Sequence, residues 1–442
     1  MARRRKHAPL QVLLNNRLVG HLKKEPSGAI GFLYDPDWLH WDQALPVSLS
    51  LPLREDAYKG EVVAAVFENL LPDSNNLRRM VAEKVGAEGA DAYSLLTRIG
   101  RDCVGALQFI PGDEDAAPAA REIAGEPIDD RNIELLLNNL ARAPLGLGED
   151  DDFRISIAGA QEKTALLWHG RKWLRPHGTT PTTHILKTQI GRLQNGIDLS
   201  DSIENEYYCL KLLAAFGLPV NHAEIRTFGR TKALVIERFD RRLTAEGHLL
   251  RVPQEDFCQA LACPPTRKYQ SEGGPGMADI LERLKASDTP AEDQKKFLKA
   301  QILFWLIGAT DGHAKNFSVF LGPGGTFSLT PFYDVLTAQP SLDARRIERK
   351  QMKLAMFVGT GRHYRMDEIA GRHFMQTTER AGLPAGLASE VMDDILKDAD
   401  AVPGRLAKEL PNGFPDAIHA SVMKSLRTRL RALKVAARAS SA

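Results

Sequence analysis

The stretch WLIGATDGHAKNFSVF (305–320), followed by LTPFYD (329–334), decides the fold of this chain. The apolar residues at 302–307 predict a buried helix, which is rigid enough to position the polar loop that follows it. That loop carries Asp311 and Asn316, and a second apolar run then leads to Asp334. Two carboxylates and one amide are therefore expected beside rigid segments.

The spacing of Asp311 and Asn316 matches the catalytic loop of protein kinases. In that loop the aspartate accepts the proton of the substrate hydroxyl, and the asparagine carbonyl oxygen binds magnesium. Asp334 stands where kinases place the aspartate of Asp-Phe-Gly, which is the second magnesium ligand. The alternative interpretation is an ordinary polar turn, because Asp, Gly, His and Asn are common turn formers.

Further groups suited to phosphoryl transfer lie upstream. Lys187 ends a strand-like run, as a phosphate-binding lysine does, and Glu204 or Glu206 on the next helix could pair with it, with Glu206 preferred. The loop Ala158–Lys163 is rich in small residues and could bring backbone N–H groups close to phosphate. The alternatives are a lysine that caps an exposed strand end and a plain hairpin turn.

The run Val235–Phe239 lies between the strand-rich and the helical part of the sequence. An apolar strand that ends at such a junction suits a hinge that hydrogen-bonds adenine through its backbone. A plain core strand is the alternative interpretation.

Periodicity predicts an α+β fold with two lobes, in which a small strand-rich N-terminal part precedes a largely helical C-terminal lobe. Asn15 and Asn16 tolerate positive φ and predict the turn of a hairpin over 11–20. Further strands are expected at 29–34, 46–53, 153–158, 164–168, 183–187 and 233–239, and helices from residue 62, at 129–141 and at 203–216. The predicted parts are 1–110 (N-terminal α/β subdomain), 111–152 (linker, with 111–128 at the surface, and short helix), 153–245 (nucleotide-binding lobe) and 246–442 (helical lobe with the catalytic loop).

Composition is ordinary for a globular chain of 442 residues, with 43% hydrophobic and 26% charged residues and a net charge of +2. The four cysteines are scattered, which argues against a zinc site. No apolar run reaches the ~20 residues that cross a bilayer, so we expect a cytoplasmic protein. Arg3–Lys6 and the last 22 residues, which hold six basic and no acidic groups, are basic ends; a solvated helix face is the simplest interpretation of the second.

Taken together, these pieces resemble the HipA family of toxin kinases of type II toxin–antitoxin systems. Stretches of the family type run through the whole sequence: SLSLPL (48–53), ENLLPDS (68–74), IGRDCVGA (99–106), FRISIAGAQEKTALL (153–167), TPTTHILK (180–187), ENEYYCL (204–210), VIERFDRR (235–242), PQEDFCQ (253–259), YQSEGGPG (269–276), WLIGATDGHAKNFSVF (305–320), LTPFYD (329–334) and KLAM (353–356). Runs as long as RISIAGAQEKTALL are too specific to arise by chance.

The resemblance implies a kinase-like fold and an ATP-dependent protein serine/threonine kinase. It assigns Asp311 as catalytic and Asn316 and Asp334 as ligands of Mg²⁺. The residues that it places around ATP are Ala158, Gly159, Ala160, Gln161, Glu162, Lys163, Lys187, Glu237, Arg238, Phe239, His313, Ala314, Lys315, Asn316, Tyr333 and Asp334.

The resemblance also implies a substrate, a site of autophosphorylation and a partner. The family phosphorylates glutamyl-tRNA synthetase, which halts translation and promotes persistence, and it autophosphorylates a serine that corresponds to Ser156. Its partner is a HipB-like helix-turn-helix antitoxin dimer that binds operator DNA. Family members contact DNA through basic side chains of the C-terminal lobe, whereas 373–383 here offers Arg380 alone. The alternatives are a small-molecule phosphotransferase and a catalytically idle co-repressor subunit.

Overall fold

The structure is a computed structural model that describes residues 7–112, 123–147, 155–159, 161–192 and 198–440. The chain forms two compact units. Unit 1 comprises Met1–Thr188, Arg226–Thr266 and Ser318–Thr326, and unit 2 comprises Gln189–Ile225, Arg267–Phe317 and Phe327–Ala442. The predicted boundary at 145–152 falls mostly outside the described residues, and the predicted parts stay predictions.

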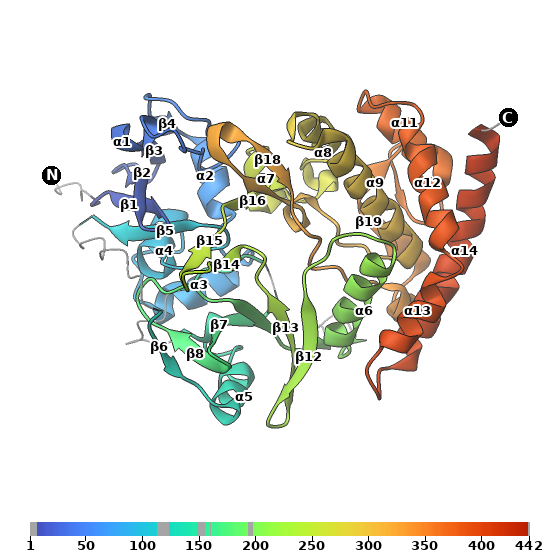
Figure 1. The fold of residues 1–442 in the computed structure, drawn as a ribbon, viewed down its shortest axis with the longest axis horizontal. Coiled ribbons are helices and arrows are strands. Elements are labelled where there is room, and N and C mark those ends of the chain that lie inside the picture. The colour runs from blue at the N-terminus through green and yellow to red at the C-terminus, as the bar shows by residue number, and fades with distance from the viewer. Residues whose placement is uncertain (1–6, 113–122, 148–154, 160, 193–197, 441–442) are drawn as a thin grey trace. The chain divides into compact units, whose positions relative to one another are not determined.

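Unit 1 begins with a five-stranded sheet in the order β4-β3-β2-β1-β5 (Figure 1). Its antiparallel strands are β1 (Leu10–Leu14), β2 (Arg17–Lys24), β3 (Ile30–Tyr34), β4 (Tyr58–Lys59) and β5 (Leu107–Pro111). Asn15 and Asn16 form the turn between β1 and β2 with φ of 47° and 66°, which confirms the predicted hairpin. The accompanying helices are α1 (Pro36–Leu39), α2 (Glu61–Glu68), α3 (Asn75–Lys84) and α4 (Ala92–Ile99).

The strand predicted at 46–53 is wrong, because these residues form bends and turns. Pro46 and Pro52 have no backbone N–H to contribute to a ladder. The hydroxyls of Ser48 and Ser50 hydrogen-bond the carbonyl of Gln259 instead, at 3.3 and 2.8 Å. Alternating polarity here reflects side chains that hold a loop.

The second sheet has the order β12-β13-β9-β7-β8-β6, and all of it except residues 223–225 belongs to unit 1. Its strands are β6 (Gly125–Pro127), β7 (Lys163–His169), β8 (Lys172–Pro176), β9 (His184–Lys187), β12 (Ala223–Phe228) and β13 (Thr231–Glu237). Helix α5 (Asp130–Asn138) buries Ile133 and Leu137 in a core with Leu166, Trp173 and Val235 of this sheet. Unit 1 also contains β14 (Arg241–Leu243), β15 (Leu249–Arg251), β16 (Gln254–Asp256), α7 (Phe257–Ala260) and β17 (Ser318–Leu321).

Two predictions for this region need correction. Within the predicted linker 111–128, residues 113–122 lie outside the description, but Gly125–Pro127 is an edge strand rather than linker. Within the predicted strand 153–158, the described residues form no strand: Ile155 makes one isolated bridge to Asp102, and 156–158 are irregular.

Unit 2 is mainly helical. Its longer helices are α6 (Ser202–Ala215), α8 (Met277–Arg283), α9 (Pro290–Ile307), α10 (Gln339–Asp343), α11 (Gly371–Arg380), α12 (Leu387–Asp398), α13 (Val402–Glu409) and α14 (Asp416–Ser440). Its strands are β10 (Gly191–Arg192), β11 (Asp198–Leu199), β18 (Phe327–Leu329), β19 (Lys353–Val358) and β20 (His363–Arg365). The buried α9 packs against α12 and α14 (Figure 1). No helix in the described part of the chain is long and apolar enough to cross a membrane.

Candidate active site

Helix α9 delivers the chain to the predicted catalytic loop, and its C-terminus is unusually well supported. Gly308 follows it in the left-handed conformation, with φ of 80°. Arg429 of α14 donates hydrogen bonds to the carbonyls of Trp305 and Leu306, at 2.9 and 3.2 Å. A cation suits this negative helix end. Burial lowers the pKa of Arg429 to about 10, so this arginine is a structural group and not part of a solvated basic face.

The loop after α9 holds one exposed carboxylate among buried neighbours. Asn316 donates from Nδ2 to the backbone carbonyl of Asp311 at 2.7 Å, which closes the loop on itself. Gly312 is required because a Cβ would lie 2.6 Å from the ring of Phe304. The Asp311 side chain is 53% exposed, whereas His313, Lys315 and Asn316 are buried. The backbone of Asp311 is therefore held in place, while its carboxylate group is exposed.

The segment that carries Asp334 runs beside this loop. Thr337 forms an antiparallel bridge with Ala309, and the Tyr333 hydroxyl donates to the carbonyl of Lys315 at 3.1 Å. Asp334 itself has φ of 57°, a left-handed conformation that is uncommon outside glycine but that aspartate tolerates better than most residues. Asp311 and Asn316 thus share one loop of unit 2, and the segment that carries Asp334 is attached to that loop through Tyr333 and Thr337.

These residues fit a magnesium ion by their chemistry. Because the Nδ2 of Asn316 is engaged with Asp311, its amide oxygen is turned the other way and is an available hard ligand. Magnesium is usually held by one or two carboxylates together with substrate phosphates, rather than by a cage of protein groups. Among the described residues no group of three or more His, Cys, Asp and Glu could hold a metal ion by itself.

The second group of predicted residues lies in unit 1. Lys163 and Lys187 are direct partners in the antiparallel pair β7–β9, so their side chains share one face of the sheet. Both are nearly buried, at 6% and 5% exposure. Two ammonium groups on one face at one end of a sheet are suited to an anionic ligand.

The predicted phosphate loop folds back onto Lys163. Its ammonium group donates to the carbonyl of Ala158 at 2.7 Å, and Gly159 has φ of 104°. This φ strongly favours glycine, and a Cβ at this position would also lie 2.5 Å from the Lys163 nitrogen, which would have to shift. Gln161 donates to the carbonyl of Thr188 at 2.8 Å, and Ala160 lies outside the described residues. Glu162 is exposed.

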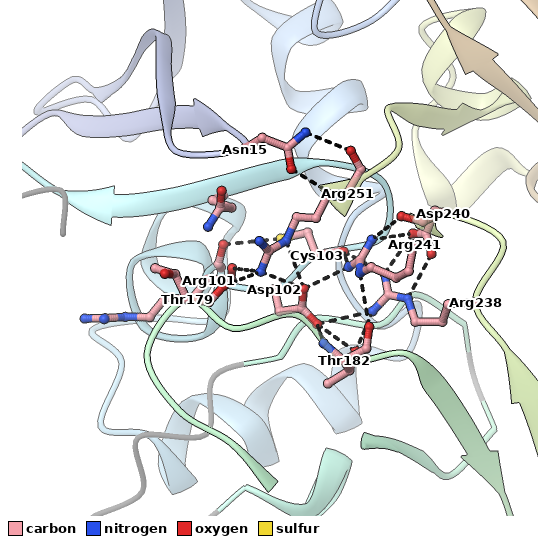
Figure 2. Close-up of polar contacts among 12 residues, drawn as sticks. Asn15, Arg101, Asp102, Cys103, Thr179, Thr182, Arg238, Asp240, Arg241 and Arg251 are labelled. Carbon is pink, nitrogen blue, oxygen red and sulfur yellow. Dashed lines mark hydrogen bonds and ion pairs between the residues drawn. The ribbon is translucent and has the colours of Figure 1, made fainter. Parts of the chain in front are cut away.

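The predicted hinge is anchored by a buried ionic cluster, which we call the Asp102 network: Asp102, Thr182, Arg238, Asp240, Arg241 and Arg251 (Figure 2). Arg238 follows β13 directly. Its N–H donates to the carbonyl of Thr183 at 2.8 Å, and its guanidinium makes paired bonds of 2.9 and 2.8 Å to Asp240. Arg238 thus points into the protein, whereas Glu237 is exposed and Phe239 packs on Phe320.

Asp102 is the centre of this network (Figure 2). Its carboxylate pairs with Arg241 at 2.8 Å, with Arg251 at 3.0 Å and with Arg238 at 3.3 Å, and it accepts a 2.7 Å hydrogen bond from the Thr182 hydroxyl. Burial alone would raise the pKa of Asp102, but the three guanidinium groups hold it well below its usual range. The carboxylate is therefore ionised throughout the neutral range.

Ser156 lies against the same network. Its N–H donates to the backbone carbonyl of Asp102 at 3.0 Å, and its hydroxyl donates to the carbonyl of Leu70 at 2.8 Å. The side chain is fully buried. Pro72 forms a parallel bridge with Gly159, so residues 70–72 hold both Ser156 and the start of the phosphate loop.

The acidic residues of α6 are buried in unit 2. Glu204 accepts a hydrogen bond from Gln189 at 2.7 Å, and Glu206 is 1% exposed. Lys187 belongs to unit 1, so the pairing of Lys187 with Glu206 stays a prediction.

Sequence reasoning missed two features. The members of the Asp102 network were not recognised, although three recurring stretches supply most of them: IGRDCVGA, TPTTHILK and VIERFDRR. The signal was Asp102 among small and apolar residues in IGRDCVGA, together with the charged residues that directly follow an apolar run in VIERFDRR. Tyr269 of the stretch YQSEGGPG was also missed, although its hydroxyl hydrogen-bonds the Asp311 carboxylate.

The profile of the HipA-like C-terminal domain matches residues 155–402, and that of the HipA N-terminal domain matches residues 10–110. The putative kinase Y4mE of Sinorhizobium fredii is 37% identical over 353 residues, which are 78% of this chain and 82% of the relative. The serine/threonine-protein kinase toxin HipA of Shewanella oneidensis is 26% identical over 96% of this chain and 94% of the relative.

A solved structure shows the same fold. HipA in the Shewanella oneidensis complex of HipA, HipB and operator DNA superposes with a TM-score of 0.78 at 23% identity, covering 96% of this chain and 98% of that one. This likeness confirms the predicted α+β, kinase-like fold. Relatives named as kinases confirm the predicted enzyme class.

Proposed function

Because this chain belongs to the HipA family, as its recurring stretches predicted, we propose that it is a toxin kinase that transfers the γ-phosphate of ATP to a serine of another protein. The main support for this proposal is that hydrogen bonds hold two loops of unit 2 beside each other. The Asn316–Asp311 and Tyr333–Lys315 hydrogen bonds fix the loop of the exposed Asp311 beside that of Asp334. Phosphoryl transfer depends on such positioning.

Each predicted residue then has a physical task. Asp311 accepts the proton of the attacking hydroxyl, because its tip is exposed and its base is fixed. Asn316 and Asp334 would hold magnesium, which supplies positive charge to the phosphate oxygens. Lys187 and Lys163 offer ammonium groups to the phosphates, and the exposed hinge residue Glu237 lies at the end of the strand that would face adenine.

The substrate and partner are finer proposals. We propose glutamyl-tRNA synthetase as the acceptor, so that phosphorylation stops charging of its tRNA, arrests growth and promotes persistence. We propose a HipB-like antitoxin dimer as the partner, through which the kinase represses its own operon on operator DNA. The solved relative was crystallised with HipB and operator DNA, which supports this assembly. We expect the protein to act in the bacterial cytoplasm.

Inactivation by autophosphorylation at Ser156 is part of the same proposal. A phosphate there adds about −1.5 to −2 charges. Ser156 is fully buried and lies three residues before the phosphate loop residue Gly159, which packs on Lys163. The modified serine would not fit its present place, so the loop would be displaced and ATP binding lost.

The decisive experiment incubates the purified chain with ATP, magnesium and glutamyl-tRNA synthetase, and compares it with Asp311→Asn. The wild type should phosphorylate the synthetase and arrest growth when expressed, and the variant should lose both while still binding the antitoxin. Asp393→Asn, at an exposed position of α12, is the matched control for loss of a carboxylate in unit 2 and should keep both activities. Equal behaviour of wild type and Asp311→Asn would refute the kinase proposal and favour an idle co-repressor. Phosphorylation of small molecules alone would favour the small-molecule phosphotransferase.

A further inference from the structure

Tyr269 contacts the predicted catalytic loop at two points. Its hydroxyl donates a hydrogen bond to Oδ1 of Asp311, and its ring stands edge-on against His313, with centroids 4.8 Å apart and planes at 89°. His313 is nearly buried, at 3% exposure. The side chain of Tyr269 therefore contacts both the exposed carboxylate of Asp311 and the buried ring of His313.

The segment that presents Tyr269 is a tight turn built on glycine. The N–H groups of Glu272 and Gly274 both donate to the carbonyl of Tyr269, at 3.0 Å each. A Cβ at Gly274 would lie 1.9 Å from the carbonyl oxygen of Arg267, and a Cβ at Gly276 would lie 1.8 Å from the Gln270 amide. A side chain at Gly274 would therefore collide with the backbone, and one at Gly276 would displace the Gln270 side chain from its present place.

The turn is also tied to its surroundings within unit 2. The Gln270 amide oxygen accepts a 2.8 Å hydrogen bond from the N–H of Phe357 in β19. The N–H of Gly276 donates to the Asp279 carboxylate at 2.8 Å, at the start of α8. Tyr269 thus lies on a turn that has its own internal hydrogen bonds. Further hydrogen bonds connect this turn to strand β19 and to the start of helix α8.

Tyr269 could act as a gate or as a group that orients Asp311, and its rigid support favours the second role. A gate that occupies the place of the substrate hydroxyl would have to swing away, which needs a mobile segment. A group that orients the carboxylate needs the opposite, a rigid support. A hydrogen bond at Oδ1 restricts rotation of the carboxylate group and so fixes the direction in which Asp311 can accept a proton.

We infer that Tyr269 is a positioning residue that orients the Asp311 carboxylate for proton acceptance from the substrate hydroxyl, and that the turn 267–276 exists to hold it there. This inference rests on the proposed function, in which Asp311 is the catalytic base. It assigns a task in the kinase reaction to a stretch whose residues have no other role in the site.

The test measures ADP release and phosphate transfer to glutamyl-tRNA synthetase by the full chain, with Tyr269→Phe as the central variant. Phenylalanine keeps the ring against His313 and removes the hydrogen bond. We expect kcat to fall about tenfold, with KM for ATP unchanged. The acidic limb of the pH–kcat profile should move to higher pH, because the lost hydrogen bond had favoured the ionised carboxylate. Tyr364→Phe, in β20, is the control and should change neither.

A second variant guards against a folding defect. Gln270→Met keeps Tyr269 but removes the acceptor for the Phe357 N–H, so it should lower kcat by less and again leave KM for ATP unchanged. ADP release is read for every variant, so Tyr269 is tested even if the synthetase is not the acceptor. Wild-type rates and pH profile in Tyr269→Phe, with Asp311→Asn inactive, would overturn the positioning role alone. A higher kcat in Tyr269→Phe would identify a gate instead. Full activity of Asp311→Asn would refute the proposed function itself.

Discussion

The hydroxyl of Ser156 donates a hydrogen bond to the carbonyl oxygen of Leu70 at 2.8 Å, and no part of the serine side chain is exposed. A hydroxyl in this position cannot meet a nucleotide. Phosphorylation of Ser156 therefore requires that the segment Ile155–Gly159 first leave its place beside Asp102 and Pro72.

The first prediction concerns this serine. Ser156→Ala should lower the free energy of unfolding by about 1 kcal/mol, because one buried hydrogen bond is lost, and should keep transfer to a substrate. Ser156→Asp should lower transfer at least about tenfold, because a carboxylate would be buried without a partner. Urea unfolding and intact-mass spectrometry after incubation with ATP check both. Phosphate on Ser156 at the same rate as on the substrate would contradict the requirement for release.

The second prediction separates three lysines of one sheet. Lys187→Met and Lys163→Met should each lower kcat/KM for ATP by about 100-fold or more, because a charge next to the transferred phosphate is lost. Lys172→Met, in β8, removes an exposed lysine of the same sheet and should leave kcat/KM unchanged. Initial rates at varied ATP concentration give the comparison. A similar loss in all three variants would mean that the sheet and not the two ammonium groups had been damaged.

The third prediction uses the charge balance of the Asp102 network, which has three guanidinium groups and two carboxylates. Asp102→Asn should lower the free energy of unfolding by about 3–5 kcal/mol, because it leaves buried cations without their counter-ion. Arg251→Met brings the remaining charges to balance and should cost less, about 1–2 kcal/mol, for its lost hydrogen bonds. Urea midpoints measure both, and equal losses would show that charge balance does not govern this site.

The fourth prediction concerns pH. His373 stacks on His363 at 4.0 Å, and its Nδ1 accepts a hydrogen bond from the N–H of Ala370 at the start of α11. Burial, followed by the charges of His363 and Arg372, lowers the pKa of His373 to about 4. The unfolded value is about 6.5, so the unfolded chain binds more protons between these values. Stability is therefore full above pH 6.5 or so and falls as the pH drops toward 4.

His373→Gln tests this dependence with little disturbance, because glutamine suits the third helical position and can accept the same hydrogen bond. The variant should lose the part of the pH dependence that lies between about pH 6.5 and 4. His222→Gln, at an exposed position of the same unit, should retain it. Urea midpoints at several pH values give the result, and an unchanged slope in His373→Gln would assign the effect elsewhere.

Local chemistry explains what could be predicted from sequence. The hairpin turn at Asn15–Asn16 follows from two residues that tolerate positive φ, and Asp311 with Asn316 follows from spacing within one loop. The strand predicted at 46–53 failed because serines make contacts more than 200 residues away that the local pattern does not contain.

Long-range contacts explain what was missed. Asp102 and Arg241 are 139 residues apart in sequence and meet only after folding. Tyr269 reaches Asp311 across 42 residues by a turn whose glycines look like an ordinary loop. Arg238 was predicted at the nucleotide because it lies in the hinge stretch, but its side chain is buried and pairs with Asp240, just after the end of β13. The prediction that remains for Arg238 is that its backbone lies at the ATP site, in the hinge that hydrogen-bonds adenine.

The Asp102 network also bears on how such chains evolve. Asp102 comes from the part that matches the HipA N-terminal domain, and Thr182 and the three arginines come from the part that matches the C-terminal domain. A gene that encoded the second part alone would bury three guanidinium groups with Asp240 as their sole carboxylate in this network. Recombination that separates the two parts would therefore be costly. We expect the segments that match the N-terminal and the C-terminal domain to be inherited together.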